Sequence, residues 1–408
     1  MLDFSFSKKL KELPEYIQGI DRVSEINNIL NENEDWKIEA KKTLDTYLEK
    51  MVELEASDMD VGGSGSKYYV WFRIQGTKKP HQDFGEISFD DATALICSIL
   101  TERQMDSLMI SQNSDFSYSI PYQGVKQRFR ADTYLDLDNL AINFRRINAK
   151  PFKISQLGFP RAIIQRFDLD YEKKGLILVT GITGSGKSTT LDAIVDMNNN
   201  KNFGHVVIIG KPIEYVHKSR KCIVRHREVG RDTISFKDGS IESLRQDPDI
   251  IIIGEMRDPE TIMTALEITD SGHKVFSTLH TGSAIESVHR IVAECPSSEQ
   301  NRVRMRLADV LSVVVSQKLV PGLKGRVVLA KEILSVTPSV SAAIMNNNIS
   351  EIYQMINEGR QYGMITLEQD LLRLYANGKI SRETAISFSN NKKRIKELLE
   401  YYRRKVSR

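Results

Sequence analysis

Hydrophobic and polar positions follow three different spacings along the chain, and the first is helical. In residues 1–55 charges are dense, and apolar side chains recur at helix spacing, as at Leu44, Leu48 and Met51. That spacing places apolar groups on one side of an α-helix. We expect a helical N-terminal extension over residues 1–55, and its small apolar content indicates an appendage.

The second stretch, residues 56–147, mixes strand and helix patterns. A Gly/Ser-rich patch at 62–66 precedes the strand-like run Tyr68–Ile74, and a helical pattern follows near 91–109. Further strand patterns lie near 116–120, 127–134 and 141–146. This mixture predicts an α+β domain over 56–147, and the prolines within 148–160 mark that segment as a linker.

The third pattern begins near Gly175, where short runs that are apolar almost throughout alternate with helix patterns. Such runs suit strands that are covered on both faces, as in a parallel sheet flanked by helices. They lie at 176–180, 206–209, 250–253, 275–278 and 326–330. We therefore expect an α/β core over 161–335, a helical region over 336–390 and a tail over 391–408.

Composition and signal patterns narrow the class of protein. Hydrophobic residues make up 40% of the chain and charged residues 27%, which is ordinary for globular domains. No apolar run approaches the ~20 residues of a membrane span, and the first residues lack the order of a secretory signal. We expect a cytoplasmic protein with buried reduced thiols at Cys97, Cys222 and Cys295, which are too scattered for a zinc knuckle.

Charge is concentrated at one end of the chain. Residues 391–408 carry eight Lys and Arg residues against two glutamates, although the whole chain has a net charge of only +3. Such a tail can contact anionic lipid, nucleic acid or an acidic partner, and a solvated terminal helix is the plainer interpretation. We expect no specific nucleic-acid binding, and peripheral membrane contact through the tail stays open.

A glycine-rich segment carries the first recognisable chemistry. Residues 181–188 fit the pattern G-x-x-x-x-G-K-[ST] and lie between an expected strand and an expected helix, the context in which this motif binds phosphates. Its backbone N–H groups wrap the phosphates, Lys187 meets the β and γ oxygens, and Ser188 ligates Mg²⁺. The sequence thus predicts a site for ATP or ADP with Mg²⁺, built from Gly181, Thr183, Gly184, Ser185, Gly186, Lys187, Ser188 and Thr189.

An acidic residue follows a later apolar strand pattern. The run Ile250–Ile253 leads into Gly254 and Glu255, as expected of the strand that presents a metal-binding carboxylate in phosphate-loop enzymes. We expect Glu255 to hold the Mg²⁺ together with Ser188.

These segments together resemble the secretion and type IV pilus ATPases, and above all the PilT-type retraction motors. Five blocks occur in the order of that family, at 181–190, 227–233, 245–250, 254–261 and 277–281. The resemblance covers about residues 57–390. It implies a PAS-like N-terminal domain joined to a RecA-like ATPase core, and a homo-hexamer at the inner face of the cell membrane. It also implies ATP hydrolysis coupled to pilus retraction and twitching motility, with an inner-membrane pilus platform protein as partner.

The resemblance also implies roles for single residues. Glu255 would be the Walker B acid, and His280 would lie near the γ-phosphate. Arg128, Arg130 and Arg145 match arginines that complete the site of a neighbouring subunit in ring ATPases, where cationic forks stabilise the transferring phosphoryl group. The plainer interpretation of these three arginines is surface ion pairing on an exposed sheet.

The chain departs from the family in two places. Residues 210–214 read Gly-Lys-Pro-Ile-Glu where the family has Glu-Asp-Pro-Ile-Glu, whose first glutamate is taken to activate water. On an extended strand Glu214 would lie ~13 Å from Gly210, so it can substitute only if the backbone turns, as a bend at Pro212 would allow. We keep Glu214 as a catalytic candidate and expect hydrolysis to be slow. In the second place, Ser341 and Ala342 replace the Arg and Asn of a motif tied to retraction.

Two other functions stay open. The missing carboxylate at Gly210 favours a nucleotide-binding, weakly hydrolysing accessory ring subunit that acts with a paralogous ATPase. A type II or type IV secretion or conjugation ATPase is the further alternative. Motors of that kind often carry a four-cysteine zinc site, which three scattered cysteines do not supply.

Overall fold

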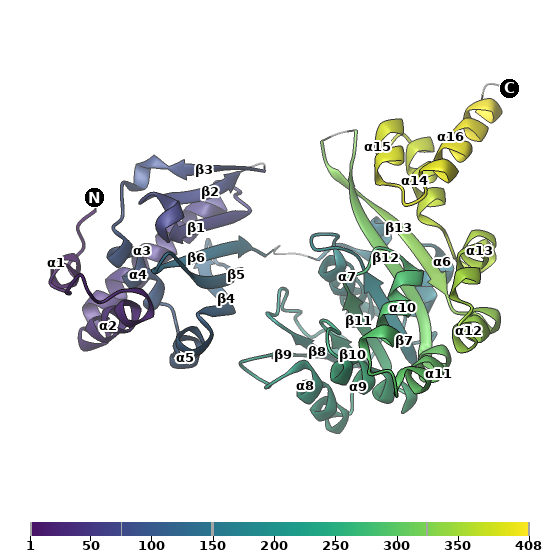
Figure 1. Cartoon of the computed structure of the whole chain (residues 1–408), viewed down its shortest axis with the longest axis horizontal. Coiled ribbons are helices and arrows are strands. Elements are labelled where there is room, and N and C mark those ends of the chain that lie inside the picture. The colour runs from purple at the N-terminus through teal and green to yellow at the C-terminus, as the bar shows by residue number, and fades with distance from the viewer. Residues whose placement is uncertain (1, 75, 148–150, 324, 407–408) are drawn as a thin grey trace. The chain divides into compact units, whose positions relative to one another are not determined.

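The chain folds into two compact units, residues 1–149 and 150–408, in a computed structural model (Figure 1). The structure describes residues 2–74, 76–147, 151–323 and 325–406. Residues 148–150 of the expected linker and 407–408 of the expected tail lie outside the described residues. We call the two parts unit 1 and unit 2.

Unit 1 contains a six-stranded antiparallel sheet in the order β3-β2-β1-β6-β5-β4. Its strands are β1 (Asp58–Gly62), β2 (Val70–Ile74), β3 (Thr77–His81), β4 (Asn113–Tyr122), β5 (Val125–Asp136) and β6 (Asn139–Arg146). Its helices are α1 (Ser7–Leu10), α2 (Gly19–Glu32), α3 (Glu34–Glu53), α4 (Phe89–Cys97) and α5 (Glu102–Ser111), with 3-10 turns at Ser64–Ser66 and Gln82–Phe84.

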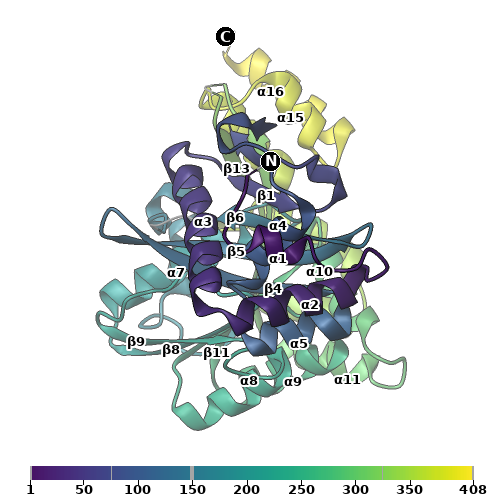
Figure 2. The same ribbon diagram turned by 90° about the vertical axis from the view of Figure 1, so that its left-hand side faces the viewer.

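The expected appendage is part of the core of unit 1, and this prediction was wrong. Leu30, Leu44 and Leu48 are at most 1% exposed and belong to the same hydrophobic cluster as Phe72 and Phe144 of the sheet. The helices α2 and α3 pack against α4, which in turn covers β6 (Figure 2). The apolar positions of the first 55 residues are few, but they share one face of each helix and are almost all buried there.

Unit 2 is built on a seven-stranded sheet in the order β13-β12-β7-β11-β10-β8-β9. All neighbours are parallel except β12 and β13, which form an antiparallel pair. The strands are β7 (Gly175–Thr180), β8 (Gly204–Gly210), β9 (Cys222–Glu228), β10 (Ile250–Ile253), β11 (Lys274–Leu279), β12 (Leu311–Pro321) and β13 (Val327–Ser335). Because β7, β10 and β11 are buried along their whole length, they read as continuous apolar runs, and the expected α/β class is confirmed.

Two hydrophobic cores cover the two faces of this sheet. Leu176 and Leu178 of β7 point into one core and Ile177 and Val179 into the other, as the alternation of side chains along a strand requires. The surrounding helices are α6 (Arg161–Phe167), α7 (Lys187–Lys201), α8 (Phe236–Ser243), α9 (Pro259–Asp270), α10 (Ala284–Glu294), α11 (Gln300–Val310), α12 (Pro338–Met345) and α13 (Ile352–Glu358). Single 3-10 turns lie at Ile154–Leu157, Leu244–Gln246, Ile349–Glu351 and Arg360–Tyr362.

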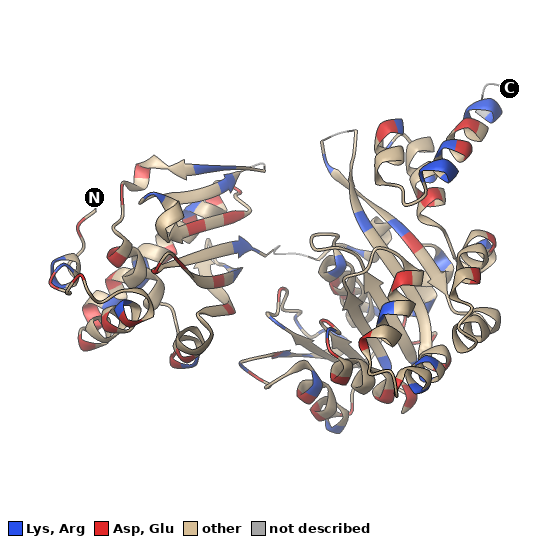
Figure 3. Cartoon of the chain, in the orientation of Figure 1, with Lys and Arg blue, Asp and Glu red and all other residues tan. Residues whose placement is uncertain are grey.

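A smaller core forms where the last three helices meet β12 and β13. These helices are α14 (Leu367–Ala376), α15 (Arg382–Phe388) and α16 (Lys392–Val406). The basic tail is therefore mostly helix α16, which buries Ile395 and Leu399, and Figure 3 colours the Lys and Arg positions of this helix blue. Among residues 2–74, 76–147, 151–323 and 325–406, no helix combines the length and the apolarity that a membrane crossing requires.

The three cysteines lie in these cores as free thiols. Cys97, Cys222 and Cys295 are all buried and unbridged, which agrees with the expectation from their spacing. Burial raises the pKa of the Cys97 thiol to about 12 and that of Cys222 to about 11, so both are protonated at neutral pH.

Candidate nucleotide-binding site

The glycine-rich segment joins the end of β7 to the start of α7. Gly181, Gly184 and Gly186 have φ values of +147°, +78° and +88°. A Cβ atom on Gly181 would lie 2.5 Å from the carbonyl oxygen of Gln317, so a larger residue does not fit there. A Cβ atom on Gly184 would meet nothing within 4 Å, which leaves open space over the loop. The loop therefore leaves its backbone accessible at the start of α7, the geometry that accepts phosphates.

Lys187 curls back over this loop. Its Nζ donates hydrogen bonds to the carbonyl oxygens of Gly181 at 2.8 Å and Ile182 at 3.1 Å. Burial lowers the pKa of Lys187, while the negative charges of Glu255 and Glu214 oppose that shift. Both carboxylates thus act electrostatically on the lysine of the loop.

The other predicted loop residues differ in exposure. Thr183 and Ser188 are exposed, Thr189 is half-buried and Ser185 is buried. The Ser185 hydroxyl has no hydrogen-bond partner within the part of the chain that the structure describes. A buried hydroxyl of this kind beside an open loop fits a site whose remaining partner is a ligand.

Glu255 and His280 meet beside the loop, because β10 and β11 are neighbours and each residue follows the end of its strand. The Nε2 atom of His280 lies 2.8 Å from Oε1 of Glu255, and Nε of Arg257 lies 2.6 Å from the same oxygen. Burial and the charge of Lys187 lower the pKa of His280, although Glu255 opposes this. The ring is therefore neutral at pH 7, with its proton directed at the carboxylate.

The residues expected to hold Mg²⁺ are of the right chemical type. Ser188 lies in the first turn of α7, and Glu255 acts on the neighbouring Lys187. Hydroxyl and carboxylate oxygens are the ligands that Mg²⁺ prefers, usually completed by substrate phosphates. The described parts of the chain contain no group of three His, Cys, Asp or Glu side chains arranged to bind a metal on its own.

The segment after β8 does not continue as a strand, which is the condition under which Glu214 is kept as a catalytic candidate. Strand β8 ends at Gly210, and residues 211–219 contain neither helix nor strand. The ~13 Å separation assumed an extended chain beyond Gly210. Because the chain turns there, the Glu214 carboxylate comes close enough to act on the pKa of Lys187.

Gly210 itself is closely packed. A Cβ atom on this residue would lie 2.9 Å from Cδ1 of Ile213, closer than such contacts normally come. The neighbouring Gly254 donates its N–H to the carbonyl oxygen of Ile209 at 2.8 Å. In this packing a carboxylate at position 210 requires Ile213 to move.

The three predicted arginines lie together on β5 and β6 of unit 1. Arg130 forms two bonds to Asp115, at 3.0 and 2.5 Å, and Nε of Arg145 lies 2.9 Å from Asp58. Arg128 is partly buried on β5, and its carbonyl oxygen accepts the N–H of Ile147. Ion pairing within the sheet is thus present for Arg130 and Arg145.

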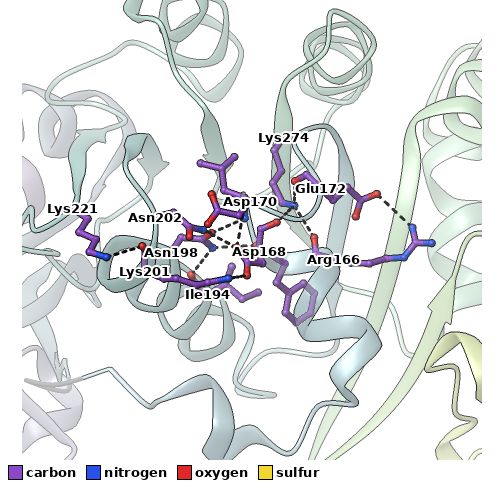
Figure 4. A network of polar contacts seen from close by, with 12 residues as sticks. Arg166, Asp168, Asp170, Glu172, Ile194, Asn198, Lys201, Asn202, Lys221 and Lys274 are labelled. Atoms are coloured by element: carbon purple, nitrogen blue, oxygen red, sulfur yellow. Dashed lines mark hydrogen bonds and ion pairs between the residues drawn. The ribbon is translucent and has the colours of Figure 1, made fainter.

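A polar network that no sequence pattern predicted fixes the far end of α7 (Figure 4). Asp168 accepts hydrogen bonds from Lys201 and, at 2.7 Å, from Asn202. Burial opposes the charge of Asp168, yet these bonds keep its pKa below the ordinary value. The Asn198 side chain accepts the N–H of Leu169 at 2.9 Å. The helix that begins at the phosphate loop is therefore anchored at its other end as well.

Comparisons with known proteins were made on the whole chain. Residues 32–400 match the family model described as type II/IV secretion system protein. The chain is 41% identical to the type IV pilus retraction ATPase PilT of Pseudomonas aeruginosa, over 72% of this chain and 83% of that protein. It is 37% identical to a twitching motility protein of Neisseria gonorrhoeae, over 74% and 79%. The crystal structure of the pilus retraction motor PilT with bound ADP superposes with a TM-score of 0.76 at 37% identity, covering 86% of this chain and 98% of that one.

Proposed function

We propose that this chain, a member of the type II/IV secretion system protein family, is a subunit of an ATP-hydrolysing motor for type IV pilus retraction. The observation that carries the proposal is the convergence of Lys187, Glu255 and His280 at one edge of the RecA-like sheet of unit 2. Glu255 and His280 share a contact of 2.8 Å, and the charge of Glu255 acts on Lys187. Relatives with this family's fold include a retraction ATPase and a twitching motility protein, over most of their length.

The nucleotide would lie over the phosphate loop. Backbone N–H groups of residues 181–188 and the Lys187 ammonium would bind its phosphates, with the first turn of α7 adding its positive helix end. Ser188 and Glu255 would hold Mg²⁺, which supplies positive charge against the β and γ oxygens. Lys187 would then exchange its bonds to Gly181 and Ile182 for bonds to phosphate.

Glu214 is the residue that we assign to water activation. Gly210 has no carboxylate, and Glu255 is engaged by His280 and Arg257. A base in hydrogen-bond reach of the water contributes ~10²–10⁴-fold to the rate. The neutral His280 directs its proton at Glu255 and would thereby hold that carboxylate in place at the same edge.

A second candidate is the weakly hydrolysing accessory subunit, and the missing carboxylate at Gly210 is the observation in its favour. Phosphate release by the purified full-length chain decides between the two functions. The motor proposal expects steady turnover that Lys187→Ala abolishes together with ATP binding, and that Glu214→Gln reduces by about 10²-fold or more. Turnover that is already negligible in the wild-type chain, with ATP binding intact, would favour the accessory subunit.

The assembly and its location complete the proposal. We infer a homo-hexamer in the cytoplasm that acts on an inner-membrane pilus platform protein, with Arg128, Arg130 and Arg145 completing the site of a neighbouring subunit. The relatives named above support an oligomeric ATPase of the pilus machinery. Light scattering of the full chain with ATP and Mg²⁺ tests the ring, and a persistent monomer at micromolar concentration contradicts it.

A further inference from the structure

Buried His217 in the connection between β8 and β9 forms a polar pair with partly buried Asp192 of α7, and the chemistry above does not use this pair. The side chain of His217 is only 1% exposed, and its Nε2 atom lies 3.0 Å from Oδ1 of Asp192 on α7. Burial raises the pKa of Asp192, and the hydrogen bond from His217 opposes that shift. An apolar pair would fill the same space without removing a carboxylate from water, but it would lack the directional bond.

The connection runs along α7 in the same direction as the helix. Beyond His217, the side chain of Asn199 donates to the carbonyl oxygen of Lys218 at 2.8 Å and accepts the N–H of Arg220 at 2.9 Å. Asp192 and Asn199 are two helical turns apart, or ~10 Å along the axis. The connection is therefore fixed to α7 at two points, Asp192 and Asn199.

Glu214 is held between two fixed points of this connection. On one side, the N–H of Ile213 donates to Oε2 of Glu228, the last residue of β9, at 3.0 Å. On the other side, the N–H of His217 donates to Nε2 of His226 at 3.0 Å, while the His217 ring bonds Asp192. These two hydrogen bonds fix the backbone on either side of Glu214.

We propose that the His217–Asp192 pair is a positioning contact that holds Glu214 at the attacking water and thereby sets the rate of hydrolysis. The inference rests on the proposed function, in which Glu214 is the base. His217 touches neither nucleotide nor water in this role. Asp192 belongs to the same helix as Lys187, so the pair fixes the base relative to the phosphate loop. A displacement of about 1 Å at a reacting group can cost ~10²-fold in rate.

The first test compares His217→Ala with His217→Gln in the full-length chain. His217→Ala should lower kcat by about 10- to 100-fold and change the ADP dissociation constant by less than about threefold, because phosphate binding does not depend on the pair. Glutamine carries an amide N–H of similar reach, so His217→Gln should recover most of the lost kcat. Phosphate release and calorimetry with ADP give the two quantities. Equal kcat in the wild type and His217→Ala would overturn the inference.

Asn199→Ala is the matched control for a merely structural role. Asn199 is buried on α7 and, like Asp192, bonds the connection between β8 and β9. Its bonds lie at the end of the connection that is farther from Glu214 in sequence. Its loss should lower Tm about as much as the loss of His217 while leaving kcat within about twofold of the wild type. If both substitutions lower kcat alike, the connection acts through folding alone and the positioning role is refuted. Should His217→Ala not fold, His217→Asn takes its place, because its shorter amide falls short of Asp192.

A double-mutant cycle separates this inference from the function on which it rests. In a Glu214→Gln background, His217→Ala should have almost no further effect on kcat, since both changes remove the same contribution. If Glu214→Gln alone leaves kcat unchanged, the assignment of the base fails. If Glu214→Gln slows hydrolysis but the two effects multiply independently, the assignment stands and the positioning role fails.

Discussion

Arg130 of β5 and Arg145 of β6 lie directly opposite each other, and each guanidinium is bonded to an aspartate of its own unit. Two facing cations repel each other, and Asp115 and Asp58 offset that repulsion. An arginine that serves a neighbouring subunit must exchange such a carboxylate for phosphate. Arg145, whose side chain is 63% exposed, meets this requirement more easily than Arg130, which holds two bonds to Asp115.

Arg145→Ala should therefore lower kcat at least about tenfold and leave ATP affinity nearly unchanged, as expected of a group that stabilises charge in the transition state. Arg73→Ala is the matched control, because Arg73 also pairs with Asp58, at 3.5 Å, and is 41% exposed. Phosphate release at saturating ATP measures both variants. If kcat falls equally in the two variants, the ion pairs serve only the stability of unit 1.

Restoring the family's carboxylate at position 210 should not accelerate hydrolysis. The Cβ atom of Gly210→Glu would lie 2.9 Å from Ile213, whose N–H helps to hold the connection that carries Glu214. We expect a lower Tm and an unchanged or reduced kcat. Thermal unfolding and phosphate release check this, with Lys211→Asp as a control at the adjacent exposed position. A rate increase of tenfold or more in Gly210→Glu would instead identify position 210 as the missing base.

The basic helix α16 should have one face that stabilises the fold and another that can contact a membrane. Leu399 is 3% exposed in the small core with α14, so Leu399→Ala should cost about 2–5 kcal/mol of stability. Replacing exposed Arg403, Arg404 and Lys405 by alanine should leave Tm and turnover unchanged. Sedimentation with anionic liposomes then tests membrane contact. If the wild type and this triple variant bind the liposomes equally, and salt does not change the binding, contact through this helix is ruled out.

Lys274 should make the stability of unit 2 depend on pH. Burial lowers its pKa to about 8 from the ordinary lysine value of 10.5, although its ammonium bonds the carbonyl oxygen of Arg166 at 2.7 Å. Between these two values the unfolded chain binds more protons, so the free energy of unfolding rises with pH across that window.

Lys274→Met removes this contribution and keeps an unbranched side chain that is one heavy atom shorter. The free energy of unfolding of the wild type, relative to Lys274→Met, should therefore grow from about pH 7.5 to about pH 9.5. Urea unfolding at the two pH values provides the measurement. Because every other titrating group is common to both proteins, a constant difference would show that Lys274 is not deprotonated in the folded chain.

The local sequence was sufficient to predict an element where a single segment both forms the element and contains the pattern that identifies it. Ile250–Ile253 reads as a buried parallel strand because both faces are covered, and the phosphate loop lies in one contiguous stretch between a strand and a helix. The helices of residues 1–55 were also predictable as elements. Their burial was not, because it depends on α4, a partner that comes later in the chain.

The candidate site was predictable only in part for the same reason. The location of Glu214 depends on where β8 ends and on hydrogen bonds from the neighbouring residues to β9 and α7. The bond between His217 and Asp192 joins a loop to a helix face. No periodicity marks such a pair in the sequence, since each residue alone reads as an ordinary polar position. The pairing of Asp58 and Asp115 with arginines likewise follows from strand register.

The strand order of unit 2 has a consequence for synthesis on the ribosome. Strand β7, which leads into the phosphate loop, pairs with β11 and β12 rather than with β8. Its hydrogen-bonding partners therefore emerge only after residue 274 has been translated, whereas the whole sheet of unit 1 is available by residue 146. Unit 1 can fold while the phosphate loop still lacks both neighbouring strands. Nascent chains that end before β12 should therefore contain a native first unit but should not bind nucleotide.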